Sequence, residues 1–248
     1  MVECHPWVAL LAFGIILYFS IRNWLWILSL PDDPASTSGG WLGVRARRWY
    51  RECVGPLEDV FVQAGIRPDT ITYSQLALAV VAAAAFASGA MFVAGWLVIA
   101  SGTLDVLDGS VARRTGGGTR RGAFVDSVVD RYAELIVYAG LAVYFRGTRI
   151  EWAVWLAAFG SLLVSYARAR AEGLGIECPI GGAQRAERVV ALGFGAFLSD
   201  ILAHVWCALG GAFSQALLAT TLVAMAIVAN VTALERARWV AQRLGGDR

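Results

Sequence analysis

The amino-acid sequence predicts an all-α integral membrane protein. We expect a six-span helical core, an interfacial amphipathic helix before it and an extra N-terminal apolar helix. Hydrophobic residues make up 58% of the 248 residues, and the mean hydropathy of +0.59 is too high for an ordinary soluble domain. Residues 70–104 contain no charged side chain and no histidine, a length that suits two spans. All 21 basic residues are arginine, and they cluster in every second gap between apolar segments.

Residues 1–40 form the first predicted region, an N-terminal apolar helix and a linker. The apolar run 7–21 has no basic start, and Glu3 stands where a signal peptide would be positive. We therefore expect an extra span or a membrane-lying helix rather than a cleaved signal. Residues 31–40 are rich in Pro, Ser and Gly, which is typical of a linker.

Residues 41–66 form the second predicted region, an interfacial amphipathic helix. Its apolar residues recur at helical spacing, namely Tyr50, Val54, Leu57 and Phe61. Arginines lie beside this stripe or away from it, as in a helix on a membrane surface. We expect Pro56 to kink or interrupt the helix.

Residues 67–248 form the predicted core. Its six spans are expected at 70–88, 91–113, 121–145, 151–171, 186–206 and 212–236. The four arginine clusters lie at 45–51, 113–121, 168–188 and 236–243. Because cytoplasmic loops of membrane proteins are enriched in basic residues, we expect all four clusters on the cytoplasmic side of the cell (inner) membrane. The net charge of +2 and arginines that adjoin spans argue against nucleic-acid binding.

Four aspartates are spaced to meet at the cytoplasmic ends of two neighbouring spans. Asp105 and Asp108 stand at i and i+3, in line with Gly109 and Ala112 at i+4 and i+7. On the next predicted helix, Gly122, Asp126 and Asp130 stand at i, i+4 and i+8. The short connection makes these helices antiparallel neighbours, so the four carboxylates can converge.

Such a cluster needs compensation, because a carboxylate within a span costs about 2.5–3.5 kcal/mol. Two divalent cations, Mg²⁺ or Mn²⁺, are the natural partners of hard oxygen ligands and can activate an attacking oxygen and stabilise a leaving phosphate. Gly109 and Gly122 leave room for a substrate, and Arg113 can bind a diphosphate oxygen. The alternatives are helix-end salt bridges to nearby arginines, or a membrane transporter with an intramembrane acidic site. Crowding of the carboxylates at one end disfavours a transport path.

The acidic motif resembles the signature of the CDP-alcohol phosphotransferase family at every position. It reads Asp105-x2-Asp108-Gly109-x2-Ala112-Arg113-x8-Gly122-x3-Asp126-x3-Asp130. The resemblance covers the six core spans and excludes residues 1–40. It implies a six-span enzyme, commonly a homodimer, whose two-metal site opens to the cytoplasm. Such enzymes move a phosphatidyl-type group from a CDP-linked lipid such as CDP-diacylglycerol to an alcohol and release CMP.

The resemblance also implies roles for individual residues. By that likeness Asp105, Asp108, Asp126 and Asp130 bind the metals, and Asp130 is also the catalytic general base. The CDP group would be surrounded by Gly109, Ala112, Arg113 and Gly122.

The entry to the first core span adds two candidate residues to the nucleotide pocket. Residues 67–72 resemble the family's Pro-Asn-x-Leu-Thr segment, with Asp69 where Asn is usual. The likeness adds Asp69 and Thr72 to the CDP-binding residues. The alternative interpretation is that Asp69 or Thr70 simply caps the helix.

A second group of arginines indicates an acceptor that carries its own phosphate. Residues 165–172, Ser-Tyr-Ala-Arg-Ala-Arg-Ala-Glu, are similar to a segment of phosphatidylinositol-phosphate synthases, which use inositol 1-phosphate. That similarity implies an acceptor pocket made of Ser165, Arg168, Arg170, Arg185, Arg188 and Arg236. Relatives often have Pro where Ala186 stands, and topology alone also places arginines here. Glycerol 3-phosphate, free inositol and serine are the alternative acceptors.

Overall fold

The computed structural model describes residues 43–208 and 216–245, together with helical residues at 18, 22–23, 25–27 and 29. Within these residues all regular structure is α-helix, which confirms the predicted fold class. Most of the predicted N-terminal apolar helix and the connection between the last two predicted spans lie outside the described residues.

Seven long helices are described in full. Their bounds are α2 Gly43–Gln63, α3 Pro68–Ala87, α4 Met91–Arg114, α5 Arg120–Tyr144, α6 Ile150–Glu172, α7 Arg185–Ala208 and α8 Ala216–Gly245. Each predicted core span corresponds to one of the helices α3 to α8. The clearest difference is at the end of α8, which continues to Gly245 instead of ending near residue 236.

Four helices, α3, α4, α6 and α8, are long and apolar enough to cross a membrane. The helices α5 and α7, with 25 and 24 residues, have similar lengths but do not meet the same criterion among the described residues. Charged residues interrupt the first half of α5, from Asp126 to Glu134. Several helices are therefore suited to crossing a membrane, and the count of six stays a prediction.

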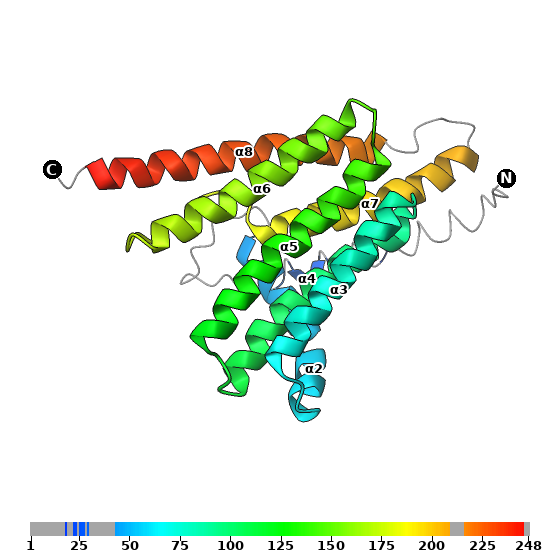
Figure 1. Cartoon of the computed structure of the whole chain (residues 1–248). Coiled ribbons are helices and arrows are strands. Elements are labelled where there is room, and N and C mark those ends of the chain that lie inside the picture. Colours follow the sequence, from blue (N-terminus) through cyan, green and yellow to red (C-terminus); the bar gives the residue numbers. More distant parts are fainter. Residues whose placement is uncertain are drawn as a thin grey trace.

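The helix packing places α3 between α4 and α5. α3 packs along both of them, α4 also packs on α7, and α6 pairs with α8 across the top of Figure 1. Two glycines allow helices to approach closely: a methyl group on Gly140 of α5 would collide with the backbone of Ala83 in α3, and one on Gly95 of α4 with the backbone of Gly193 in α7. The core around these contacts includes Phe86.

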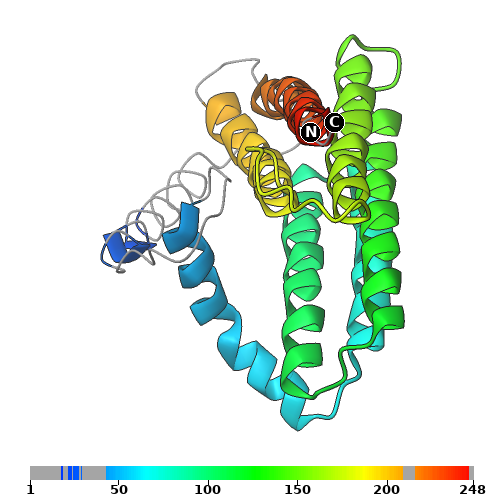
Figure 2. The same cartoon turned by 90° about the vertical axis from the view of Figure 1, so that its left-hand side faces the viewer.

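The helix α2 runs obliquely beside the upright α3, α4 and α5 (Figure 2). Val54 and Phe61 from its predicted stripe pack on a buried cluster around Leu107, whereas Leu57 is exposed. The helix continues through Pro56, so the predicted interruption is absent. Its position at a membrane surface stays a prediction.

A hydrogen bond fixes the middle of α2 to α4. The hydroxyl of Tyr50 lies 2.6 Å from Thr103 Oγ1 and donates to it. Burial raises the pKa of Tyr50, so the hydroxyl stays a neutral donor.

Candidate active site

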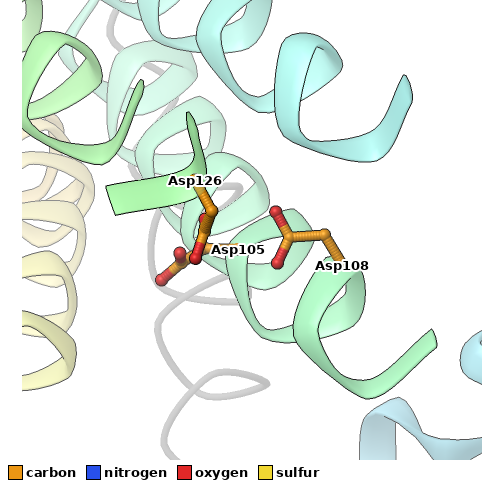
Figure 3. A group of neighbouring side chains, drawn as sticks. All are labelled: Asp105, Asp108 and Asp126. Carbon is orange, nitrogen blue, oxygen red and sulfur yellow. The ribbon is translucent and has the colours of Figure 1, made fainter. Parts of the chain in front are cut away.

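Three aspartates meet in the space between α4 and α5. Asp105, Asp108 and Asp126 each offer one carboxylate oxygen, and these oxygens lie within 4.8 Å of one another. Figure 3 shows two of the side chains rising from α4 and the third coming from α5. Because α4 and α5 both pack against α3 rather than closely against each other, their acidic faces can meet across this space.

This acidic trio, Asp105, Asp108 and Asp126, fits a divalent cation. Asp108 is only 3% exposed, so its charge is poorly solvated. Asp126 Oδ1 is buried and has no hydrogen-bond partner among the described residues. Three carboxylates this close repel one another unless a cation lies between them, and Mg²⁺ or Mn²⁺ prefers such oxygen ligands.

Asp130 lies one turn beyond Asp126 on α5 and has different neighbours. Its Oδ1 accepts a hydrogen bond from Gln75 Nε2 at 2.8 Å and lies 2.8 Å from Arg185 Nη2. Asp130 as a whole residue is 7% exposed. The predicted quartet is therefore arranged as a trio plus an aspartate already held by an amide and a guanidinium.

α3 supplies two polar side chains that hold the aspartates. Thr72 donates its hydroxyl to Asp108 Oδ2 at 2.7 Å, and Gln75 bonds to Asp130. Both α3 residues are buried. Gln75 was missed from the sequence, although a glutamine inside an uncharged span, three residues after Thr72, indicated the same helix face.

The predicted CDP-binding residues line the neighbouring ends of α4 and α5. Arg113 is exposed, and its Nη1 would lie 3.3 Å from a Cβ added to Gly109, so the guanidinium lies over that glycine. Ala112 is half-buried on the following turn. The structure thus brings an exposed arginine head to a surface made of small residues.

Asp69 approaches this surface from α3. α3 begins at Pro68, with Arg67 as the N-cap residue and no side-chain cap, so Asp69 lies in the first turn and does not cap the helix. A Cβ at Gly122 would lie 3.9 Å from Asp69 Oδ1. The geometry therefore joins Asp69 to the surface around Gly122.

Arg185 is the predicted acceptor residue that reaches the aspartates. Its Nε donates to Asp105 Oδ2 at 3.1 Å, and its Nη1 donates to the backbone carbonyl of Asp130 at 2.8 Å. With its contact to Asp130 Oδ1, this guanidinium bridges α4 and α5.

Two other predicted acceptor arginines are buried and engaged with the fold. Arg188 makes a bidentate contact with Glu134 at 2.7 and 2.9 Å and donates to the carbonyl of Ala183. Arg236 donates to the carbonyls of Ile180 and Val164, both at 2.8 Å. Glu134 was missed from the sequence, although it continues the i, i+4 acidic series of α5 after Asp130.

The remaining acceptor candidates lie at the end of α6. Arg168 is exposed and pairs with Glu172 on the next turn at 2.8 Å, Arg170 is exposed, and Ser165 is half-buried. Of the six predicted acceptor residues, Arg185 therefore contacts the aspartates. Arg188 and Arg236 are buried and bonded to other protein groups, and the other three lie at the end of α6.

Comparisons with known proteins show the family of this chain. Residues 66–234 match the family model CDP-alcohol phosphatidyltransferase. The chain is 37% identical over 195 residues to archaetidylinositol phosphate synthase of Methanothermobacter thermautotrophicus, which covers 78% of this chain and 91% of the relative. It is 34% identical over 199 residues to phosphatidylinositol phosphate synthase of Mycobacteroides abscessus, covering 78% and 86%.

Solved structures of a related enzyme also match this chain. The crystal structure of Mycobacterium tuberculosis phosphatidylinositol phosphate synthase with CDP-DAG bound matches with a TM-score of 0.65 and 28% identity, over 75% of this chain and 92% of that one. The same enzyme in complex with manganese and citrate also matches with a TM-score of 0.65. The family match covers most of the chain and includes every aspartate described above. The chain belongs to the CDP-alcohol phosphatidyltransferase family.

Proposed function

We propose that this enzyme transfers the phosphatidyl-type group of CDP-diacylglycerol to inositol 1-phosphate and releases CMP. The observation that carries the proposal is the position of Arg185, which contacts both Asp105 and Asp130. A guanidinium there can bind an acceptor phosphate while the acceptor hydroxyl lies beside the aspartates. The relatives are named archaetidylinositol phosphate synthase and phosphatidylinositol phosphate synthase, and these names support this acceptor.

The chemistry follows from the arrangement of the aspartates. When bound, two divalent cations held by Asp105, Asp108, Asp126 and Asp130 neutralise the donor diphosphate and stabilise the leaving phosphate. Asp130 accepts the proton of the acceptor hydroxyl. The acceptor oxygen then bonds to the phosphorus that carries the lipid, and the bond from that phosphorus to the CMP oxygen breaks.

The surrounding residues would orient the two substrates. Arg113, above Gly109, is in reach of the donor diphosphate, and the small surface of Ala112 and Gly122 accommodates the nucleotide. Asp69 and Thr72 complete the nucleotide side, the latter through Asp108.

The acceptor side would be built in two layers. Arg185 contacts the acceptor phosphate, with the exposed Arg168, Arg170 and Ser165 at the mouth. Arg188 and Arg236 would support the wall, because they bond to Glu134 and to backbone carbonyls rather than to the aspartates.

We further propose the arrangement of the whole chain. Residues 67–248 form the six-span core, 41–66 the interfacial helix and 1–40 the N-terminal helix and linker. The distribution of arginines supports a multi-pass protein of the cytoplasmic membrane whose site faces the cytoplasm. A homodimer stays a prediction from the family resemblance.

The acceptor is tested by incubating purified enzyme with CDP-diacylglycerol, Mn²⁺ or Mg²⁺ and a panel of alcohols, and following CMP release. We expect the highest kcat/KM with inositol 1-phosphate, and Arg185→Ala should raise the KM for it much more than the KM for the donor. If glycerol 3-phosphate proved the preferred acceptor, the proposed substrate would change, but the binding of an acceptor phosphate by Arg185 would still be supported. A preference for free inositol or serine would refute it.

A further inference from the structure

An ion pair with a buried carboxylate connects α2 to the acceptor side of the site. Arg47 of α2 donates to Glu187 and, at 3.0 Å, to Gln184. Glu187 lies in the first turn of α7, two residues after Arg185, and is only 1% exposed. The α2 residues precede the region matched by the family model, which begins at residue 66.

The carboxylate of Glu187 depends on this pairing. Its Oε2 is buried without a hydrogen-bond partner in the described part of the chain, so Oε1 carries the contact with Arg47. A buried carboxylate that loses its cation is strongly unfavourable. Arg188 follows Glu187 directly, and Arg185 stands two residues before it in the first turn of α7.

Both of those arginines have other partners at the site. Arg185 is bound to Asp105 and Asp130, and Arg188 to Glu134. Without Arg47, the uncompensated charge of Glu187 and the lost contact to Gln184 would disturb the start of α7, from which Arg185 reaches the aspartates.

We propose that Arg47 is a positioning residue for acceptor binding: by neutralising Glu187, it keeps Arg185 on the aspartates. The proposal rests on the acceptor role given to Arg185 above. With Arg47, the residues that position the site would include one from α2.

The rest of α2 has its own attachments to α4. Tyr50 bonds to Thr103, and Arg114 pairs with Glu58 at 3.2 Å and with Asp59 at 2.6 Å. Loss of the Arg47 contact therefore leaves α2 docked and acts locally on the start of α7.

The test measures KM for both substrates in full-length variants, with the phosphorylated alcohol that the wild type turns over best. Arg47→Ala is expected to raise the acceptor KM about tenfold, as for loss of one charged contact, and to leave the KM for CDP-diacylglycerol within about twofold. Arg48→Ala is the matched control, because Arg48 is the next residue of α2 and pairs only with the exposed Glu52 among its described contacts. It should leave both KM values unchanged.

The double variant separates positioning from simple docking. Arg47→Ala with Glu187→Gln removes the uncompensated charge and is expected to bring the acceptor KM back to within about threefold of wild type. A double variant as impaired as Arg47→Ala, an equal rise in both KM values, or no rise at all would overturn the proposal. If Arg47→Ala does not fold, Arg47→Lys replaces it, and a smaller rise confined to the acceptor supports the proposal.

A failure of the acceptor assignment can be told apart from a failure of this proposal. If the wild type uses only an unphosphorylated alcohol, the acceptor assignment fails, and the same variants are compared on that alcohol. A rise in its KM that Glu187→Gln reverses would still support the role of Arg47.

Discussion

Each aspartate of the site has a distinct set of neighbours. Asp108 is held by Thr72, Asp105 by Arg185, and Asp126 keeps a buried oxygen without a hydrogen-bond partner in the residues described. Asp130 is fixed on one oxygen by Gln75 and Arg185. Carboxylates oriented by partners of this kind hold a metal and a reacting hydroxyl at a fixed geometry.

The role of Asp130 gives a prediction at the residue scale. Asp130→Asn keeps the shape but removes the proton acceptor, so CMP release should fall by about 10²–10⁴. Steady-state CMP release with saturating donor and acceptor measures this. Asp200→Asn, in the second half of α7, is the control and should retain activity. Normal turnover of the Asp130 variant would remove this residue from its proposed role.

At the scale of elements, glycines set how closely the helices approach. Gly140 lies against the backbone of Ala83, so α3 and α5 pack in contact along the turns that follow Asp130. The distance between these two helices fixes where Gln75 meets Asp130.

Gly140→Ala should therefore separate α3 from α5 and lower the free energy of unfolding by about 1–3 kcal/mol. Thermal unfolding of the purified protein in detergent measures the change. Gly245→Ala is the control, because Gly245 is the last residue of α8 and no described atom lies within 4 Å of an added Cβ. It should be neutral or stabilising, since alanine favours helix. An unchanged Tm for Gly140→Ala would contradict the close contact.

Helix periodicity predicted the elements, and long-range polar pairing could not be predicted. The i, i+3 spacing indicated that Asp105 and Asp108 share a face of α4, and the i, i+4 spacing placed Asp126 on the acidic face of α5. The structure brings these three aspartates together. By contrast, the pair Arg47–Glu187 joins residues 140 positions apart, and its formation depends on how α2 docks. The bidentate pair of Arg188 and Glu134 likewise depends on the contact of two helices, so topology alone could not separate structural arginines from binding ones.

At the scale of the whole molecule, one end of the helix bundle carries the chemistry. The connection between α4 and α5, the start of α3 and the end of α2 lie together at the bottom of Figure 2. The four arginine clusters belong to the same side of the predicted topology.

This topology is tested with single cysteines in a background without the four native ones. Gly118→Cys, between α4 and α5, should react with a membrane-impermeant maleimide only in inside-out vesicles. Thr148→Cys, between α5 and α6, should react only in intact cells, because α5 crosses the bilayer in the predicted topology. Labelling of both from one side would mean that α5 does not span.

The central claim is that the carboxylates of α4 and α5 together bind divalent cations, and Mn²⁺ binding to purified protein, followed by electron paramagnetic resonance, tests it most directly. The wild type should bind two ions. Asp126→Asn should lose at least about tenfold in Mn²⁺ affinity, because it removes one ligand of the acidic trio. Asp200→Asn should bind as the wild type does. Equal Mn²⁺ binding by all three proteins, or none by the wild type, would contradict the account.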